Sequence, residues 1–215
     1  MVKIKYNIND HNFADVVSRW FQANNLSKIH ENTEKYNVFD RENDNSTQWH
    51  KIYYDKINED AEFIFIYLKF INNYVKPLYN EKVVFQKKPN IRVHLPHNVA
   101  VGEYHKDKDY RDKEWCEHVK ELNYYLPLTS TNEQNTIWME SEEDKKDYKP
   151  AILNYGECLQ WDGSNLSHGN KLNSSKYTRV SIDFRVIPLS RYIESDKGSI
   201  NTKTQFKLGE YYSIL

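Results

Sequence analysis

The feature that most constrains the fold of this chain is the change in texture after residue 81. Short runs rich in Val, Ile, Tyr and Trp are separated there by Gly, Pro, Asn and Asp. Runs of this kind at fairly regular spacing are typical of the strands of a β-sandwich or barrel. We therefore predict strands over residues 82–86, 91–95, 99–105, 122–128, 136–140, 151–155, 158–161 and 179–187.

The first 80 residues have a helical pattern instead. Apolar residues at 13, 16, 17, 20 and 21 follow the spacing of an amphipathic helix. A second helix is expected from the N-cap Asn58 to Pro77, and the polar residues 30–49 are expected to form a loop. The chain thus predicts a single domain over 1–215: a helical layer (1–80), a β core (81–188) and a peripheral C-terminal tail (189–215) with a short strand near 204–207.

Composition argues against several classes of function. The formal net charge is −1 and no basic block is present, so nucleic acid is not an expected partner. Cys116 and Cys158 do not make a disulfide framework. The N-terminus lacks a signal-peptide core, and the most apolar run, 63–71, contains Lys69 and is too short to span a bilayer. We expect a soluble, cytoplasmic protein with no membrane partner.

Two histidines and an aspartate form a candidate metal site. His105 and Asp107 are two residues apart, so on a strand their side chains point to one side. His168 follows Asp107 by 61 residues and is a suitable third ligand. Two imidazoles and one carboxylate are the ligand set of the facial triad that holds non-haem Fe(II).

An arginine is predicted to lie beside this site. The polar segment 171–176 is prone to turn, so the residues on either side of it are predicted to pair as a hairpin in which His168 faces Arg179. A guanidinium is suited to bidentate capture of a carboxylate. Ser181 lies on the same strand face and can donate a hydroxyl to the same anion.

These residues resemble a known superfamily. The pattern His105-x-Asp107, then His168, then Arg179-x-Ser181 resembles the Fe(II)/2-oxoglutarate-dependent dioxygenases. Five stretches within residues 90–188 are similar to the StrG-like branch, which is associated with streptomycin biosynthesis. They are residues 92–96 (RVHLP), 100–107 (AVGEYHKD), 121–128 (ELNYYLPL), 136–141 (TIWMES) and 179–188 (RVSIDFRVIP).

The resemblance implies a fold and an activity. The fold would be mainly β, with N-terminal helices and a double-stranded β-helix (jelly-roll) core. His105, Asp107 and His168 would bind Fe(II), and Arg179, helped by Ser181, would hold the far carboxylate of 2-oxoglutarate. Oxidative decarboxylation of this cosubstrate with O2 would yield succinate and CO2. Halogenating members lack the carboxylate that Asp107 supplies, so the resemblance favours hydroxylation, desaturation or cyclisation.

Further polar residues in strand phase are candidates for ligand contacts. Asn123 could bind 2-oxoglutarate or substrate, or be a satisfied polar group of the core. Asp183 and Arg185 are in phase with Arg179 and could form an ion pair or contact the substrate. Four further residues are candidates for the substrate pocket, with a surface or core position as the alternative for each: Glu103, Tyr125, Trp138 and Glu140.

The expected reaction is hydroxylation of a small polar metabolite. The resemblance favours a sugar, an aminoglycoside or a polysaccharide precursor, and an amino acid or peptide is also open. Two rival classes share the fold: a cupin-type sugar isomerase or epimerase, and a non-catalytic carbohydrate-binding jelly roll. Release of succinate distinguishes the first rival, and Fe(II) binding distinguishes the second. The sequence leaves the oligomeric state open.

Overall fold

A computed structural model describes residues 1–32, 47–100, 103–199 and 204–215. The strands are β1 (Val2–Lys5), β2 (Val83–Gln86), β3 (Asn90–His94), β4 (Leu122–Pro127), β5 (Ile137–Met139), β6 (Lys149–Pro150), β7 (Glu157–Trp161), β8 (His168–Asn170), β9 (Arg179–Pro188), β10 (Ser195–Gly198), β11 (Gln205–Phe206) and β12 (Tyr212–Ile214). The α-helices are α1 (Phe13–Phe21), α2 (Gln48–Lys56), α3 (Ala61–Phe70) and α4 (Lys113–Val119). Short 3-10 helices span Leu26–Asn32, Lys76–Leu78, Asp107–Tyr110 and Leu189–Arg191, and a π-helical turn spans Ile71–Val75.

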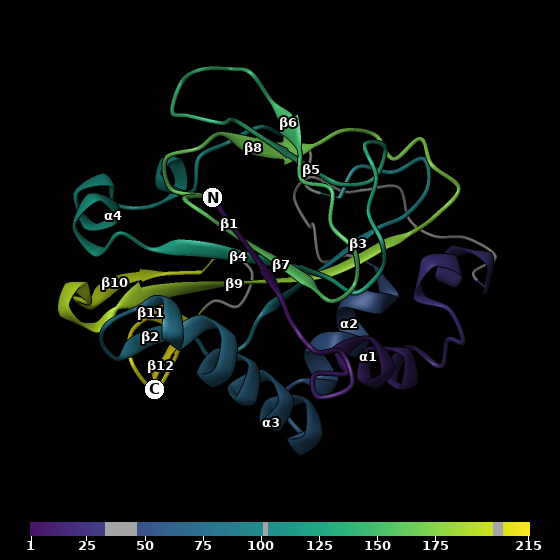
Figure 1. Cartoon of the computed structure of the whole chain (residues 1–215), viewed down its shortest axis with the longest axis horizontal. Helices are drawn as coiled ribbons and strands as arrows, with labels where there is room; N and C mark the ends of the chain where they lie inside the picture. Colours follow the sequence, from purple (N-terminus) through teal and green to yellow (C-terminus); the bar gives the residue numbers. More distant parts are fainter. Residues whose placement is uncertain (33–46, 101–102, 200–203) are drawn as a thin grey trace.

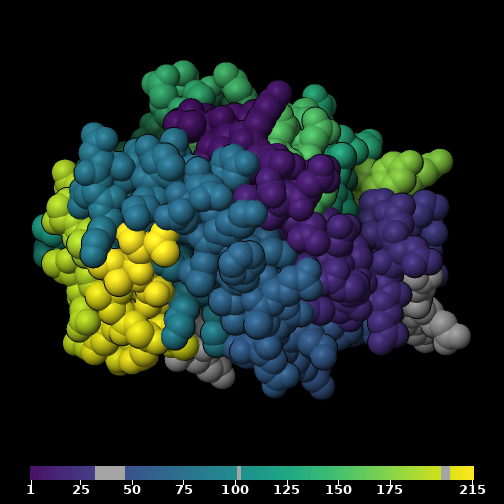
Figure 2. Space-filling model, turned by 60° about the horizontal axis from the view of Figure 1, so that its bottom comes forward, coloured from purple at the N-terminus to yellow at the C-terminus, as the bar shows by residue number. Residues whose placement is uncertain are grey.

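Two sheets and a helical layer are stacked. The larger sheet has the order β1-β7-β4-β9-β2-β12, and β3 also pairs with β9. The smaller sheet is β6-β5-β8, and β10 pairs with β11 separately. In Figure 1 the small sheet lies above the large one, and α1, α2 and α3 lie below it. Figure 2 shows this helical side, where blue segments lie between the purple N-terminal residues and the yellow C-terminal residues.

Strand β9 explains the layering, because its residues alternate between the two faces of the sheet. Its apolar residues, such as Ile182 and Phe184, are fully buried in the main core with residues from the helices. The Phe184 ring lies 5.3 Å from Tyr67 of α3 and 5.0 Å from the stacked ring of Tyr124. The other face carries Arg179, Ser181, Asp183 and Arg185 toward the small sheet. One strand thus separates the apolar core from a polar interior.

Most of the predicted elements are confirmed. The chain is mainly β with helices near its N-terminus, and structure forms at 82–86, 91–95, 122–128, 136–140, 158–161, 179–187 and the helix 13–21. The second helix begins two residues later than predicted, because Asp60 and not Asn58 is its N-cap and accepts a 3.0 Å hydrogen bond from Phe63 N. It also passes into a π turn and a 3-10 helix that contains Pro77.

Other predictions were wrong. Residues 151–155 form no strand, because the backbone of Leu153 bonds to Thr131 and not to a neighbouring strand. Leu153 N donates to the Thr131 hydroxyl at 2.8 Å, and Leu153 O accepts from both the backbone nitrogen and the hydroxyl of Thr131 at 2.9 Å. Residues 189–215 are not a peripheral tail, since β12 pairs with β2 and Tyr212 is fully buried. Helix α2 begins inside the loop predicted over 30–49, and residues 33–46 of that loop lie outside the described residues. Among the helices that the structure describes, none combines the length and apolar character needed to cross a membrane.

Candidate metal centre

A backbone bridge brings the two histidines of the site together. His105 N donates to His168 O at 3.0 Å, and His168 N donates to His105 O at 2.9 Å. The two rings are 4.6 Å apart between centroids. The strand predicted over 99–105 is therefore wrong: only this isolated bridge forms at His105, and residues 101–102 lie outside the description.

Each histidine is oriented by the carbonyl two residues before it. His105 Nδ1 lies 2.9 Å from Glu103 O, and His168 Nδ1 lies 2.9 Å from Leu166 O. A carbonyl only accepts hydrogen bonds, so Nδ1 carries the proton in both rings. The lone pair of each Nε2 is then available to a metal ion, as in other sites where a second contact fixes the ring.

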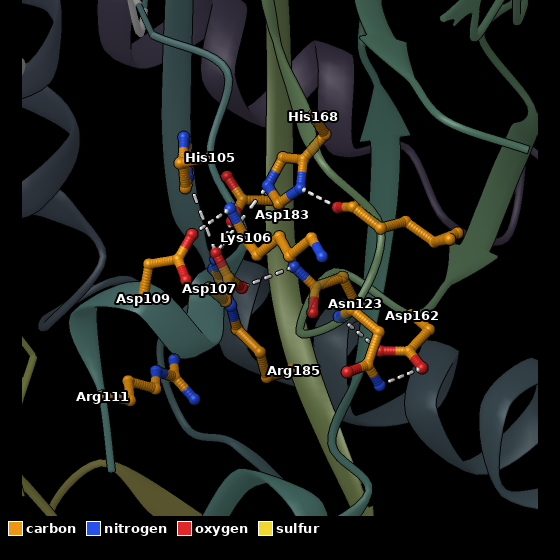
Figure 3. Close-up of polar contacts among 12 residues, drawn as sticks. His105, Lys106, Asp107, Asp109, Arg111, Asn123, Asp162, His168, Asp183 and Arg185 are labelled. Atoms are coloured by element: carbon orange, nitrogen blue, oxygen red, sulfur yellow. Dashed lines mark hydrogen bonds and ion pairs between the residues drawn. The ribbon is translucent and has the colours of Figure 1, made fainter. Parts of the chain in front are cut away.

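Asp107 completes the cluster. Its Oδ1 lies 3.7 Å from Nε2 of His105 and 3.7 Å from Nε2 of His168. The three candidate ligand atoms lie within 4.8 Å of one another, and no other such group occurs among the described residues. Asp107 starts a 3-10 helix and does not continue a strand. The prediction of a shared strand face was therefore wrong in its local structure, although the side chains do converge (Figure 3).

The second oxygen of Asp107 is already hydrogen-bonded. Oδ2 accepts 2.9 Å from Asn123 Nδ2 and 3.2 Å from Arg185 Nη2. Burial raises the pKa of Asp107, but the charge of Arg185 and the neighbouring histidines outweigh it and hold the pKa well below its usual range. The carboxylate is therefore ionised at neutral pH, as a metal ligand must be.

Metal affinity should depend on pH through His105. Burial lowers the pKa of His105, but Asp107 and the Glu103 carbonyl outweigh burial and leave the pKa above its ordinary value. Burial dominates at His168 and lowers its pKa. A metal ion must displace the proton that His105 binds, so the affinity for Co(II) should fall as the pH decreases through the raised pKa of His105, by up to about tenfold per pH unit. Calorimetric titrations between about pH 6 and 7.5 measure this, and a flat profile would contradict it.

A small cavity adjoins the triad and contains the predicted arginine. Its walls include His105, His168, Arg179, Asn170 and Trp161. Arg179 is fully buried, and its Nη1 donates to Asn170 Oδ1 at 2.8 Å. Its Nε and Nη2 have no hydrogen-bond partner among the described residues. A buried guanidinium without a carboxylate partner is costly, which makes this end of the cavity suited to an anionic ligand.

Two further unsatisfied hydroxyls lie near Arg179. Ser181 Oγ and Tyr125 Oη are buried and have no hydrogen-bond partner in the described part of the chain. Ser181 lies on the same face of β9 as Arg179, and the Arg179 guanidinium carbon is 5.9 Å from the centroid of the Tyr125 ring. These hydroxyls are available to an anion that the guanidinium binds.

The remaining sequence candidates are placed elsewhere. Glu103 is exposed and contributes its carbonyl to His105. Trp138 does not line the cavity, and its ring contacts Lys171 Nζ at 3.1 Å. Glu140 is buried, but its carboxylate accepts from the backbone nitrogens of Lys146 at 2.8 Å and Ser167 at 2.9 Å. Glu140 thus supports the segment before His168, and contact of these three residues with substrate stays a prediction.

The predicted hairpin between His168 and Arg179 was wrong. Strand β8 pairs with β5, and Arg179 pairs with His94 of β3. Arg179 nevertheless reaches the cavity, because its contact is Asn170, two residues after His168. No sequence pattern marked Asn170 or Trp161 as a site residue. The alternation of side chains along a strand could have identified Asn170, because a residue two positions after His168 lies on the same face of the strand.

Gly169 allows the two histidine segments to approach. A Cβ added there would lie 3.0 Å from Tyr104 Cα and 3.1 Å from Glu103 O, and backbone atoms cannot rotate away. We expect Gly169→Ala to lower the free energy of unfolding by about 1–3 kcal/mol and to weaken metal binding. Chemical denaturation and Co(II) titration measure the two effects. Gly198→Ala is the control, because its Cβ would meet Thr204 O at 2.8 Å, in the β10–β11 ribbon. Equal metal affinity in both variants would refute the expectation.

Comparison with solved structures identifies the fold. CytC3 with Fe(II) and α-ketoglutarate matches with a TM-score of 0.55 and 11% identity, over 92% of this chain and 78% of that one. EctD from S. alaskensis in its apoform matches with a TM-score of 0.51 and 11% identity, over 90% of this chain and 74% of that one. This chain therefore shares the fold of these two proteins.

Sequence comparison identifies the family. No protein-family model matches the chain. The streptomycin biosynthesis protein StrG of Streptomyces griseus is 32% identical over 213 residues, which cover 99% of this chain and 98% of StrG. The chain belongs to the StrG family.

Proposed function

We propose that this protein is an Fe(II)- and 2-oxoglutarate-dependent oxygenase, built as a single domain around a double-stranded β-helix. The observation that carries the proposal is the triad together with the buried, partly unpaired guanidinium of Arg179 in the adjoining cavity. Support also comes from the fold, which is shared with CytC3, a protein whose structure holds Fe(II) and α-ketoglutarate. A cupin-type isomerase has no need of a buried arginine at this position.

The residues present fit both groups. His105 Nε2, His168 Nε2 and Asp107 Oδ1 would hold the iron, and Arg179 and Ser181 would hold the distal carboxylate of the cosubstrate. When bound, Fe(II), 2-oxoglutarate and O2 supply an oxidation that also yields succinate and CO2. The protein positions these groups, keeps Asp107 ionised and excludes bulk water, since Asp107 and His168 are both buried. Hydroxylation of a small polar metabolite is the expected outcome.

The proposed substrate class follows from the family. StrG is named for streptomycin biosynthesis, so a sugar, an aminoglycoside or a polysaccharide precursor is the class to test first. A screen of such metabolites for substrate-dependent release of succinate identifies the substrate. Turnover without succinate would support an isomerase or epimerase instead.

Anaerobic titration with Fe(II) and 2-oxoglutarate tests the metal site directly. We expect a metal-to-ligand charge-transfer band in the wild type and its loss in His105→Ala. Asp109→Asn is the matched control, because Asp109 is also close in sequence but accepts from Lys106 N at 3.2 Å and is not in the triad. If the spectrum of the wild type does not change when Fe(II) is added, the result would support a non-catalytic binding protein.

A further inference from the structure

We propose that Asn123 and Arg185 form a clamp on Oδ2 of Asp107, which leaves Oδ1 as the single oxygen that Asp107 offers to the metal. The inference rests on the proposed function, because it concerns the same ion. It assigns Asn123 and Arg185 as positioning residues, which act on the metal through Asp107. Asn123 also lines the cavity, so its contact with the cosubstrate stays a prediction.

The geometry of Asp107 supports this division between its oxygens. Oδ2 receives both donors, Asn123 Nδ2 at 2.9 Å and Arg185 Nη2 at 3.2 Å. Oδ1 receives neither and lies at the same distance, 3.7 Å, from the two histidine nitrogens. Figure 3 shows Asn123 and Arg185 approaching the carboxylate from the side away from the rings. Two donors occupy the lone pairs of Oδ2 that a bidentate metal contact would need.

Arg185 is itself fixed by a chain of buried partners. Its Nη1 donates to Asp183 Oδ2, and Asp183 also accepts 3.1 Å from Asn90 Nδ2 and 3.1 Å from Arg92 Nε. Asn123 and Arg185 are register partners on the neighbouring strands β4 and β9. The clamp therefore belongs to the rigid sheet, whereas Asp107 comes from a 3-10 helix outside it. A ligand on an irregular segment needs such a support to keep one orientation.

Gly163 sets the position of Asn123. A Cβ at Gly163 would lie 2.3 Å from Asn123 Nδ2, so any side chain there would displace the amide. Gly163 O also accepts 2.9 Å from Asp107 N. The same residue thus holds the backbone of Asp107 and leaves room for the amide that holds its side chain.

A one-oxygen contact has a consequence for the ligands that the metal can take. If the metal is octahedral, the three protein atoms would occupy three of its positions and leave three for other ligands. A two-oxygen contact from Asp107 would fill a fourth. Outer contacts of this kind typically change metal affinity by about 10- to 100-fold.

Anaerobic Co(II) titration of the full-length protein tests the clamp. We expect Asn123→Ala and Arg185→Gln each to bind Co(II) about 10- to 100-fold more weakly than the wild type. The visible absorption of the bound Co(II) should also change shape in both variants, because the coordination changes. Gly163→Ala should act in the same direction by displacing Asn123.

Arg111→Gln is the matched control. Arg111 is a mostly buried arginine that pairs with Glu121. Its charge helps to lower the pKa of Asp107, but among the described residues it makes no hydrogen bond or ion pair with the triad. Arg111→Gln should lower stability, leave the Co(II) spectrum unchanged and weaken Co(II) binding far less than either clamp variant. An equal effect of Arg111→Gln on binding, or wild-type affinity and spectrum in Asn123→Ala, would overturn the clamp alone. A wild type that binds no Co(II) would overturn the proposed function as well.

Discussion

Replacement of Arg179 by leucine should strongly weaken cosubstrate binding without destabilising the protein. The wild type buries a guanidinium that makes one hydrogen bond to the described residues, the 2.8 Å contact from its Nη1 to Asn170 Oδ1. Burial lowers the pKa of Arg179, which expresses the same desolvation cost. Replacing a poorly compensated buried charge with an apolar side chain is often neutral or stabilising, here by about 1–2 kcal/mol. Loss of one partner of a buried charge pair costs about 2–5 kcal/mol of binding, so 2-oxoglutarate affinity should fall roughly 10²- to 10³-fold.

Two measurements on the same variant separate these effects. Denaturant unfolding of the ligand-free protein reports stability, and anaerobic titration with 2-oxoglutarate reports affinity. Ser181→Ala is the milder variant, because it removes one neutral hydroxyl and should weaken binding by about tenfold. Arg179→Leu protein that binds the cosubstrate within threefold of the wild type would place the anion site elsewhere.

The polar face of β9 could be predicted because it follows from the alternation of side chains within that one strand. Ten consecutive residues alternate between the faces of the sheet, so Arg179 and Ser181 had to share a side with Asp183 and Arg185. The ion pair between Asp183 and Arg185 was one of two alternatives that this phase allowed, and it forms. His105, Asp107 and His168 could likewise be predicted from the kinds of ligand that a metal prefers, although the strand predicted for His105 and Asp107 does not form.

The errors concern pairing, which a local pattern does not encode. The turn-prone segment 171–176 suggested a hairpin, yet β8 joins the small sheet and β9 the large one. The terminal strands β1 and β12 are short edge strands whose hydrogen bonds come from β7 and β2, far away in the chain. Residues 151–155 have the sequence pattern of a strand, but the backbone nitrogen of Leu153 donates to the hydroxyl of Thr131 where a strand would donate to a neighbouring backbone carbonyl. Each error reflects a partner distant in sequence.

The contacts of Asp107 show the same limit. Asn123 was in phase with the interior, and its amide could have served cosubstrate, substrate or core. Only the position of the 3-10 helix Asp107–Tyr110 brings the carboxylate within 2.9 Å of it. The sequence thus identified the three residues that converge in the candidate metal centre, whereas the contacts that orient Asp107 depend on tertiary structure.

Replacement of Asp107 by alanine should cause a large loss of both metal binding and stability. The variant removes a metal ligand, so Fe(II) or Co(II) binding should become undetectable at micromolar protein. It also leaves Arg185 buried with Asp183 as its remaining carboxylate. Removing one partner of a buried ion pair typically costs 3–5 kcal/mol, and we expect about 3 kcal/mol here because Asp183 stays. Denaturant unfolding without metal measures the stability at neutral pH.

The pH dependence and a double variant identify the source of that loss. Asp107 has a lower pKa in the folded protein than in the unfolded chain, where an aspartate titrates near pH 4. Its ionised form therefore stabilises the folded protein at pH values above about 4, and this stabilisation is lost as the pH falls through the folded-state pKa. The difference in the free energy of unfolding between the wild type and Asp107→Ala should therefore become smaller at acidic pH. Adding Arg185→Leu should recover much of the loss, because it removes the buried charge that has lost one of its two carboxylate partners, while Asp183 keeps Arg92 as its cation. Additive losses in the double variant would show that Asp107 and Arg185 are not coupled.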